Sequence, residues 1–285
     1  MVRGVTDPRS VSRQIDVMFQ GVAHAICCHQ VGDVLVDVGP ESAHQTLLEA
    51  LGDDVPRALL LTHIHFDHAG AAGALVRRWP QLEVWVHERG APHLANPERL
   101  VSSARRLYGD DFDRLWGEVV PIPEQNLRVL TGGETIGDWR VQYTPGHASH
   151  HVSYLDQRTG AAFTGDVAGA RIDNGPLIPP TPPPDIDLEL WAQSIDTIAA
   201  WQPTALAITH FGTFADVPEQ LDDLRRALVH WGQRARELDD AAYQTEISAT
   251  WGGDPNAPAY DRVVPAETLW PGLHRYWEKR VPSGT

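Results

Sequence analysis

Residues 62–68 read Thr-His-Ile-His-Phe-Asp-His, and they directly follow the apolar run Ala-Leu-Leu-Leu at 58–61. A short apolar run of this kind predicts a buried strand, so the polar cluster lies where a strand ends and a helix begins. Open α/β folds place their sites at such strand ends. Three imidazoles and a carboxylate are ligands that divalent metals such as Zn²⁺ prefer, and burying them together without a metal would be costly. The heptapeptide therefore predicts a metal site.

Four further polar residues follow strand-like runs in the same way. Asp37 ends the run 34–36, His147 follows Tyr-Thr-Pro-Gly, Asp166 follows a run ending in Thr-Gly, and His210 follows Leu-Ala-Ile-Thr. A glycine lies near each, where the backbone can approach closely. A single histidine after a strand is more often structural than functional. Five such strand ends in one chain, however, indicate a shared site.

The order of the apolar runs predicts a mixed α/β (α+β) chain. Glu41–Leu51 has helical spacing and ends at Gly52, and a second helix is expected from about His68 to Trp79, before Pro80. The other predicted elements are strands at 15–29, 33–38, 57–62, 82–87, 127–130, 134–144, 151–156, 161–165 and 204–209, and helices at 187–201 and 217–240. Two β-rich halves with helices suggest two stacked sheets covered by helices on both outer faces.

We expect residues 1–285 to form a single domain, because no polar linker or internal repeat divides the chain. A helical insertion is predicted at about 97–120, and a helical C-terminal extension at about 217–285. The extension carries Trp251, Trp270 and Trp277, which allow a homodimer. The Pro-rich segment 176–184 predicts a stiff loop that is either a connector or a wall beside the site.

Composition restricts the possible partners. The net charge is −15, with 38 acidic against 23 basic residues, which argues against binding to nucleic acid or to an anionic membrane. No apolar run reaches the roughly 18 residues of a membrane span. The first residues lack the apolar core of a signal peptide, so we expect a cytoplasmic location and a small-molecule substrate.

Over about residues 15–215, the five motifs in this order resemble the metallo-β-lactamase-fold hydrolase superfamily. Its glyoxalase II-like branch is the nearest, rather than the true β-lactamases. The resemblance implies a four-layer αββα sandwich, with the site at one edge of the two sheets. It also implies which ligands share an ion: His63, His65 and His147 bind one metal, Asp67, His68 and His210 bind the second, and Asp166 bridges the two.

The chemistry of the residues favours the same division. Seven ligands exceed what one tetrahedral site uses, whereas two sites that share a carboxylate use them all. Zn²⁺ is the expected metal, although Mn²⁺ or Fe²⁺ would accept the same nitrogen and oxygen ligands. Paired ions about 3.5–4 Å apart lower the pKa of a bridging water and generate hydroxide. Asp67 would orient that hydroxide or pass a proton to the leaving group.

Several other residues are candidates for supporting roles. Asp37 is expected to orient a metal ligand by a hydrogen bond. His151 stands where many members of the family carry a second histidine after Gly-His, and His150 has a weaker claim. Arg171 would either anchor an anionic substrate or form an ion pair. His87 would either line the pocket or be structural.

The predicted activity is metal-dependent hydrolysis of a small ester, thioester, lactone or amide by a metal-bridging hydroxide. The alternative is a persulfide dioxygenase-type oxidoreductase with one iron, and a phosphodiesterase ranks below it. Lactonases of this fold carry a tyrosine three residues after the bridging aspartate, where this chain has Gly169, which weakens the lactonase interpretation. Diiron reductases of the fold usually have Glu where this chain has His65, which argues against that class. The complete ligand set argues against a non-enzymatic binding module. The substrate itself is left open, because specificity resides in loops.

Overall fold

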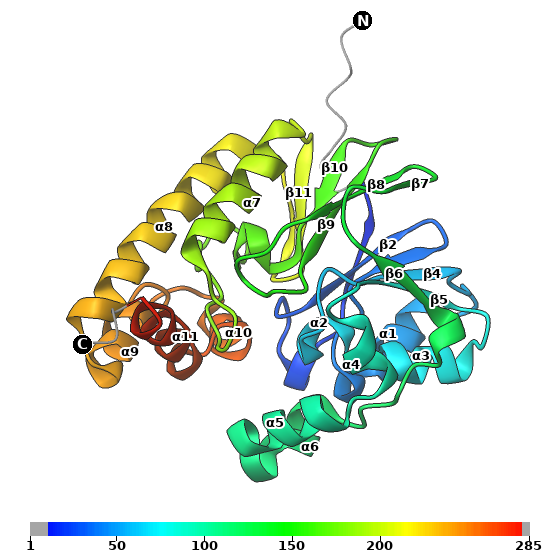
Figure 1. Cartoon of the computed structure of the whole chain (residues 1–285), viewed down its shortest axis with the longest axis horizontal. Helices are drawn as coiled ribbons and strands as arrows, with labels where there is room; N and C mark the ends of the chain where they lie inside the picture. The colour runs from blue at the N-terminus through cyan, green and yellow to red at the C-terminus, as the bar shows by residue number, and fades with distance from the viewer. Residues whose placement is uncertain (1–10, 281–285) are drawn as a thin grey trace, which may run out of the picture.

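Two six-stranded sheets form the centre of the computed structural model, which describes residues 11–280 (Figure 1). In the first sheet the strands are neighbours in chain order, and β3 to β6 run parallel. Its strands are β1 (Arg13–Asp16), β2 (Cys27–Val31), β3 (Val34–Val36), β4 (Ala58–Leu60), β5 (Glu83–His87) and β6 (Leu127–Leu130).

The second sheet has the order β12-β11-β10-β9-β8-β7, and among its pairs only β10 and β11 are parallel in the described part of the chain. Its strands are β7 (Thr135–Ile136), β8 (Trp139–Tyr143), β9 (Val152–Asp156), β10 (Ala161–Phe163), β11 (Ala205–Ile208) and β12 (Gly212–Phe214).

The alternation of side chains along the strands explains the layers. Val36 and Leu60 of the first sheet share a buried cluster with Tyr154 and Phe163 of the second, so these side chains lie between the sheets. Leu59, one position away from Leu60, belongs instead to the cluster that includes the helices. Successive residues of a strand point to opposite faces, and each sheet therefore buries both faces.

Helices cover both outer faces of the pair of sheets (Figure 1). The helices over the first sheet are α1 (His44–Leu51), α2 (Phe66–Ala69) and α3 (Ala72–Arg78), and those over the second are α7 (Leu188–Ala200) and α8 (Val217–Glu237). This arrangement confirms the predicted four-layer αββα sandwich.

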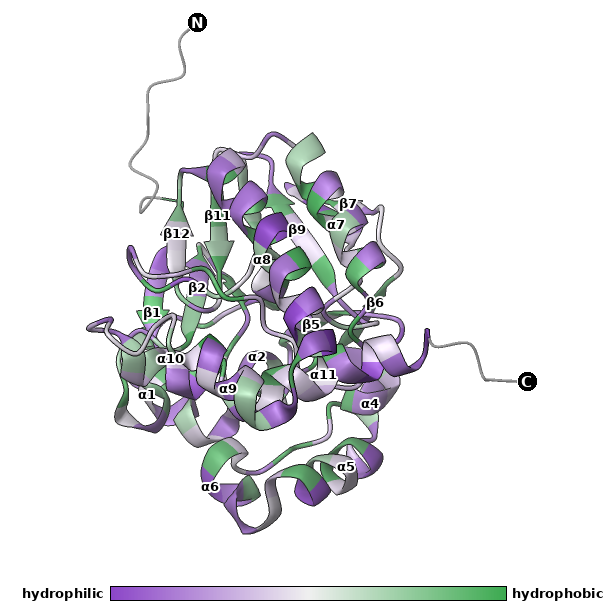
Figure 2. Ribbon diagram, turned by 90° about the vertical axis from the view of Figure 1, so that its left-hand side faces the viewer, coloured by the Kyte–Doolittle hydropathy of each residue, from purple (hydrophilic) through white to green (hydrophobic). Residues whose placement is uncertain are grey.

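Two further groups of helices lie toward one end of the sandwich in both views (Figures 1 and 2). Between β5 and β6 the chain forms α4 (Ala91–Ala95), α5 (Glu98–Tyr108) and α6 (Phe112–Trp116). After α8 it forms α9 (Asp240–Ser248), α10 (Ala257–Val263) and α11 (Ala266–Glu278). No helix within residues 11–280 is both long and apolar enough to cross a bilayer.

Three predicted elements differ from the structure. The strand expected at 15–29 is the antiparallel pair β1 and β2, because the carboxylate of Asp16 accepts hydrogen bonds from the backbone N–H groups of Met18 and His24 and closes a loop. The strand expected at 134–144 is the hairpin β7–β8, which turns at Gly137 with a φ of 59°. The helix expected at 68–79 is divided into α2 and α3.

Candidate metal centre

The ends of several strands bring the ligand-type residues together. The chain leaves β4 through His63 and His65 and enters α2, which carries Asp67 and His68. His147 lies in the loop between β8 and β9. Asp166 belongs to the short 3₁₀ helix after β10, and His210 follows β11. The carboxyl ends of β4, β10 and β11 thus converge on one site, as expected for parallel strands of α/β sheets.

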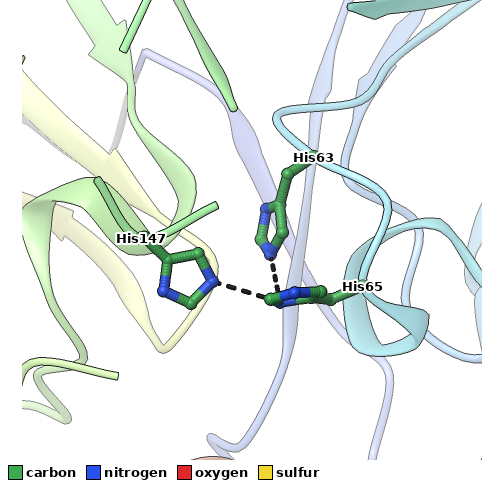
Figure 3. Close-up of side chains that lie close together, drawn as sticks. All are labelled: His63, His65 and His147. Carbon is green, nitrogen blue, oxygen red and sulfur yellow. Dashed lines mark hydrogen bonds between the residues drawn. The ribbon is translucent and has the colours of Figure 1, made fainter. Parts of the chain in front are cut away.

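Three histidine rings form the first group of potential ligands (Figure 3). His65 Nδ1 lies 2.9 Å from His63 Nε2 and 3.1 Å from His147 Nε2. Burial, reinforced by neighbouring histidines, lowers the pKa of His63, and burial lowers that of His65 to about 4. The rings are therefore neutral at pH 7, and three converging ring nitrogens suit a cation.

Asp67, His68 and His210 form the second group. Asp67 Oδ2 lies 3.4 Å from His210 Nε2 and 3.6 Å from His68 Nε2. Burial alone would raise the pKa of Asp67, but His68 and His210 outweigh burial and lower this pKa to about 2. The carboxylate is thus charged at neutral pH and available as a metal ligand.

The carboxylate of Asp166 lies between the two groups. Its Oδ1 is 3.1 Å from His68 Nε2 and 3.4 Å from His210 Nε2, while its Oδ2 is 3.4 Å from His147 Nε2. One oxygen therefore faces each group. His68 Nε2, His210 Nε2 and Asp166 Oδ1 are buried and have no hydrogen-bond partner among the described residues. Because such orphaned polar atoms are costly, the donor set fits bound divalent metal.

Asp37 orients His68 from behind. Its carboxylate is 2.7 Å from His68 Nδ1 and accepts hydrogen bonds from the Thr62 backbone N–H and hydroxyl, each at 2.8 Å, and from the Thr209 hydroxyl at 2.7 Å. Asp37 itself is 1% exposed. A buried carboxylate on Nδ1 keeps the proton on that nitrogen and leaves Nε2 free to bind a metal.

Backbone carbonyls orient two more of the histidines. His147 Nδ1 lies 2.8 Å from the Pro180 carbonyl oxygen, and His210 Nδ1 lies 3.0 Å from the Ala25 carbonyl oxygen. A carbonyl can only accept, so each ring carries its proton on Nδ1 and turns the Nε2 lone pair toward the site.

His151 lies beside the centre but outside both groups of ligands. Its ring centre is 5.1 Å from that of His63, and its Nδ1 is 3.0 Å from the Thr144 hydroxyl. Burial and the neighbouring His147 lower the pKa of His151 well below its usual value. His151 thus packs as a neutral ring behind His63, and its supporting role stays a prediction. The neighbouring His150 accepts a long hydrogen bond, 3.4 Å, from the Ile64 backbone N–H.

The side chains of the two candidate substrate residues contact groups other than the candidate ligands. The guanidinium of Arg171 is 2.7 Å from Asp216 and 3.1 Å from Gln220, and it also lies over the ring of Phe214. These contacts favour the ion pair over contact with a substrate. His87 is buried and stacks on Tyr143 with ring centres 4.5 Å apart. A role of His87 toward substrate stays untested.

Apart from Asp37, the sequence reasoning missed the groups that orient the candidate ligands. Thr62 and Thr209 each directly precede a ligand histidine at a strand end, and this repeated Thr-His pair is a signal that could have identified them. The carbonyls of Pro180 and Ala25 carry no such signal, because every residue has a carbonyl group.

Comparison with known proteins agrees with this geometry. Residues 19–210 match the family model described as the metallo-beta-lactamase superfamily. A metallo-beta-lactamase fold-containing protein of Sulfurisphaera tokodaii is 30% identical over 196 residues, which cover 66% of this chain and 71% of the relative. A hydroxyacylglutathione hydrolase of Legionella pneumophila is 28% identical over 138 residues, which cover 48% of this chain and 44% of that enzyme.

Two solved structures share the fold. An archaeal metallo-beta-lactamase superfamily protein from Sulfolobus tokodaii has a TM-score of 0.67 at 24% identity, covering 88% of this chain and 93% of that one. A metallo-beta-lactamase family protein from Thermus thermophilus has a TM-score of 0.62 at 22% identity, covering 90% and 88%. The similarity extends beyond the matched family region, since each covers more of the chain than residues 19–210.

Proposed function

The chain belongs to the metallo-beta-lactamase superfamily, and from this membership we propose that it is a binuclear metallo-hydrolase acting on a small ester, thioester, lactone or amide. The observation that carries the proposal is the position of Asp166, which presents Oδ1 to His68 and His210 and Oδ2 to His147. A mononuclear centre would not require a second complete group of ligands. This is the reason for preferring hydrolysis to the chemistry of an enzyme with one iron.

The residues of the chain divide the work. His63, His65 and His147 would hold one ion, Asp67, His68 and His210 the other, and Asp166 both. When bound, divalent ions supply Lewis acidity, which activates water and polarises a substrate carbonyl. Side-chain exposure is 20% for Asp67 but only 0–1% for His68, His147 and His210. Substrate would therefore approach beside Asp67, whose carboxylate would orient the attacking water.

Zinc is the metal that we expect, and the ligand chemistry is compatible with it. All seven residues offer nitrogen or oxygen atoms, and Cys27 and Cys28 are buried free thiols outside the site. Such a set accepts Zn²⁺, Mn²⁺ or Fe²⁺.

Among the substrate classes, thioesters come first. The hydroxyacylglutathione hydrolases of Legionella are relatives by sequence, although the chain spans less than half of their length. A panel of substrates should begin with thioesters and continue with lactones, carboxylic esters, phosphodiesters and β-lactams.

Metal removal, zinc titration and this panel together test the proposal. We expect two equivalents of zinc and hydrolysis of a carbonyl substrate that is lost with chelator. A single bound iron, with oxygen consumption on a persulfide, would instead support the dioxygenase alternative and contradict hydrolysis.

The variant Asp166→Asn tests the shared carboxylate. Because an amide binds divalent metal poorly, we expect weaker binding of both ions and a fall in turnover of more than about 100-fold, beyond the loss typical of residues that only orient ligands. Asp156→Asn is the matched control, since Asp156 is a fully buried carboxylate whose partners are Arg158 and Thr159 instead. Unchanged metal content in Asp166→Asn would exclude the bridging role.

A further inference from the structure

The Pro-rich loop at 176–184 contacts the metal centre through one backbone group. The carbonyl of Pro180, 2.8 Å from His147 Nδ1, fixes the tautomer and direction of that ring. Thr181, the next residue, is 1% exposed. Prolines at 179, 180 and 182 restrict the backbone torsions on both sides of Thr181. Because these torsions cannot adjust freely, a displacement of the loop would also move the Pro180 carbonyl.

Helix α11 also contacts this loop. The Thr181 hydroxyl donates a hydrogen bond of 2.9 Å to the Leu269 carbonyl in α11. A Cβ placed on Gly272 would lie 2.0 Å from the Thr181 carbonyl oxygen and 2.9 Å from the Pro182 carbonyl carbon. The helix therefore rests directly on the loop backbone, and no methyl group fits between them.

The two ends of the loop are fastened to the same helical extension. Tyr260 of α10 donates a hydrogen bond of 2.7 Å to the Pro176 carbonyl. Asp187, just past the loop, donates its backbone N–H to the Gly146 carbonyl at 2.9 Å and lies 3.3 Å from the guanidinium of Arg280. The residue before His147 is thus also connected to the C-terminal region.

From these contacts we propose that helix α11 is a positioning element of the metal centre. It holds Thr181 and thereby the Pro180 carbonyl, which aims His147 Nε2 at His65 Nδ1 and Asp166 Oδ2. The positioning residues are Thr181 in the loop and Gly272 in α11. This role rests on the proposed function, because it assumes that His147 binds metal. Asp67, His68 and His210 make no hydrogen bond to the loop within the described residues, so they provide an internal comparison.

Zinc titration of the full-length, metal-free chain against a competing chelator tests this role. In Thr181→Val and in Gly272→Ala we expect the ion held by His147 to bind about 10- to 100-fold more weakly, the usual effect of losing a group that orients a ligand. The weakened class of site should be the one that His147→Ala abolishes. The other ion should keep its affinity.

Two control variants separate this role from general destabilisation. Gly73→Ala creates the same clash, with its Cβ 2.0 Å from the Val120 carbonyl oxygen, but at the insertion rather than at the loop. Thr204→Val removes a hydroxyl that donates a hydrogen bond of 3.0 Å to the Thr159 carbonyl, and neither residue belongs to the loop or to α11. Thr204→Val should bind zinc like the wild type, and any loss of affinity in Gly73→Ala should fall equally on both ions.

Three results would overturn the inference. The first is wild-type zinc affinity in both Thr181→Val and Gly272→Ala. The second is equal weakening of both ions, in step with thermal stability and reproduced by Gly73→Ala. The third, a wild-type chain that binds no zinc, would overturn the proposed function as well, and it is thus distinguishable from the other two.

Discussion

At the scale of single residues, Asp37 shows how the centre is preorganised. Its carboxylate accepts hydrogen bonds from the backbone N–H and hydroxyl of Thr62 and from the Thr209 hydroxyl, and it also contacts His68 Nδ1. These four contacts fix the position of the carboxylate. Its backbone is held at a φ of 48°, a left-handed conformation that most residues avoid. The backbone of Asp37 is therefore strained in the conformation that places its carboxylate against His68.

Asp37→Asn is expected to weaken metal binding without unfolding the chain. The amide nitrogen cannot accept a hydrogen bond, so either a threonine group or His68 Nδ1 loses its acceptor. We expect about a 10- to 100-fold loss of zinc affinity, measured by competition titration. Zinc affinity equal to that of the wild type would show that Asp37 does not hold His68.

The ligand-type residues and the orienting carboxylate of Asp37 could be proposed from the sequence, whereas the other partners of the histidine rings could not. His63, His65 and His147 carry ligand chemistry in their side chains and follow strand-like runs, and the structure brings them together. The groups that aim the rings of His147 and His210 are backbone carbonyls, such as that of Pro180, 33 residues away from His147. Nothing in the residue type at position 180 indicates which imidazole its carbonyl will contact.

At the scale of elements, the helical insertion is anchored inside the metal-binding motif. Phe66 stands between His65 and Asp67, and its ring lies edge-on to Phe112 at 5.5 Å and 5.8 Å from the ring of Trp116. Tyr108 packs on Trp116 with ring centres 5.3 Å apart. Packing of α5 and α6 is therefore linked to the segment that presents four ligands.

Phe112→Ala is expected to destabilise the chain. The side chain is 1% exposed and touches Phe66, so removing it leaves a cavity beneath α6. We expect a loss of about 3–5 kcal/mol in the free energy of unfolding, measured in urea. A loss below about 1 kcal/mol would mean that the insertion is not anchored through this contact.

The pairing of strands that are distant in sequence was the hardest feature to predict. Strand β4 and helix α1 follow local patterns, and Gly52 ends the helix as expected. Residues 127–130 were predicted as a strand, but the sequence pattern does not indicate that β6 pairs in parallel with β5 across the whole helical insertion. Hydrophobic alternation indicates that a segment is a strand, but it does not indicate which sheet accepts it.

At the scale of the whole molecule, the buried histidines make the metal-free chain sensitive to acid. The residues whose pKa is lowered, in each case first by burial, are His29, His63, His65, His87, His147, His150 and His151. The carboxylates outweigh burial at His68 and His210, and the pKa of each is raised. The groups that favour the neutral ring are the more numerous.

We therefore expect the Tm of the metal-free chain to fall as pH is lowered from about 6.5 to about 4, the window set by the ordinary histidine pKa and by that of His65. In this window the unfolded chain binds protons that the folded chain excludes, so acid favours unfolding. His68 and His210 do not change the slope, because the stability that their raised pKa values add is already present throughout this window and is lost only as pH rises above it. A Tm that rises or stays level across the window, followed by differential scanning calorimetry, would contradict this balance.

Anomalous diffraction at the zinc edge from zinc-loaded crystals would show whether two ions share Asp166. We predict two zinc peaks about 3.5–4 Å apart, one on His63, His65 and His147 and one on Asp67, His68 and His210. The carboxylate of Asp166 should contact both. A single zinc peak, or two peaks of which neither touches Asp166, would contradict a shared binuclear centre.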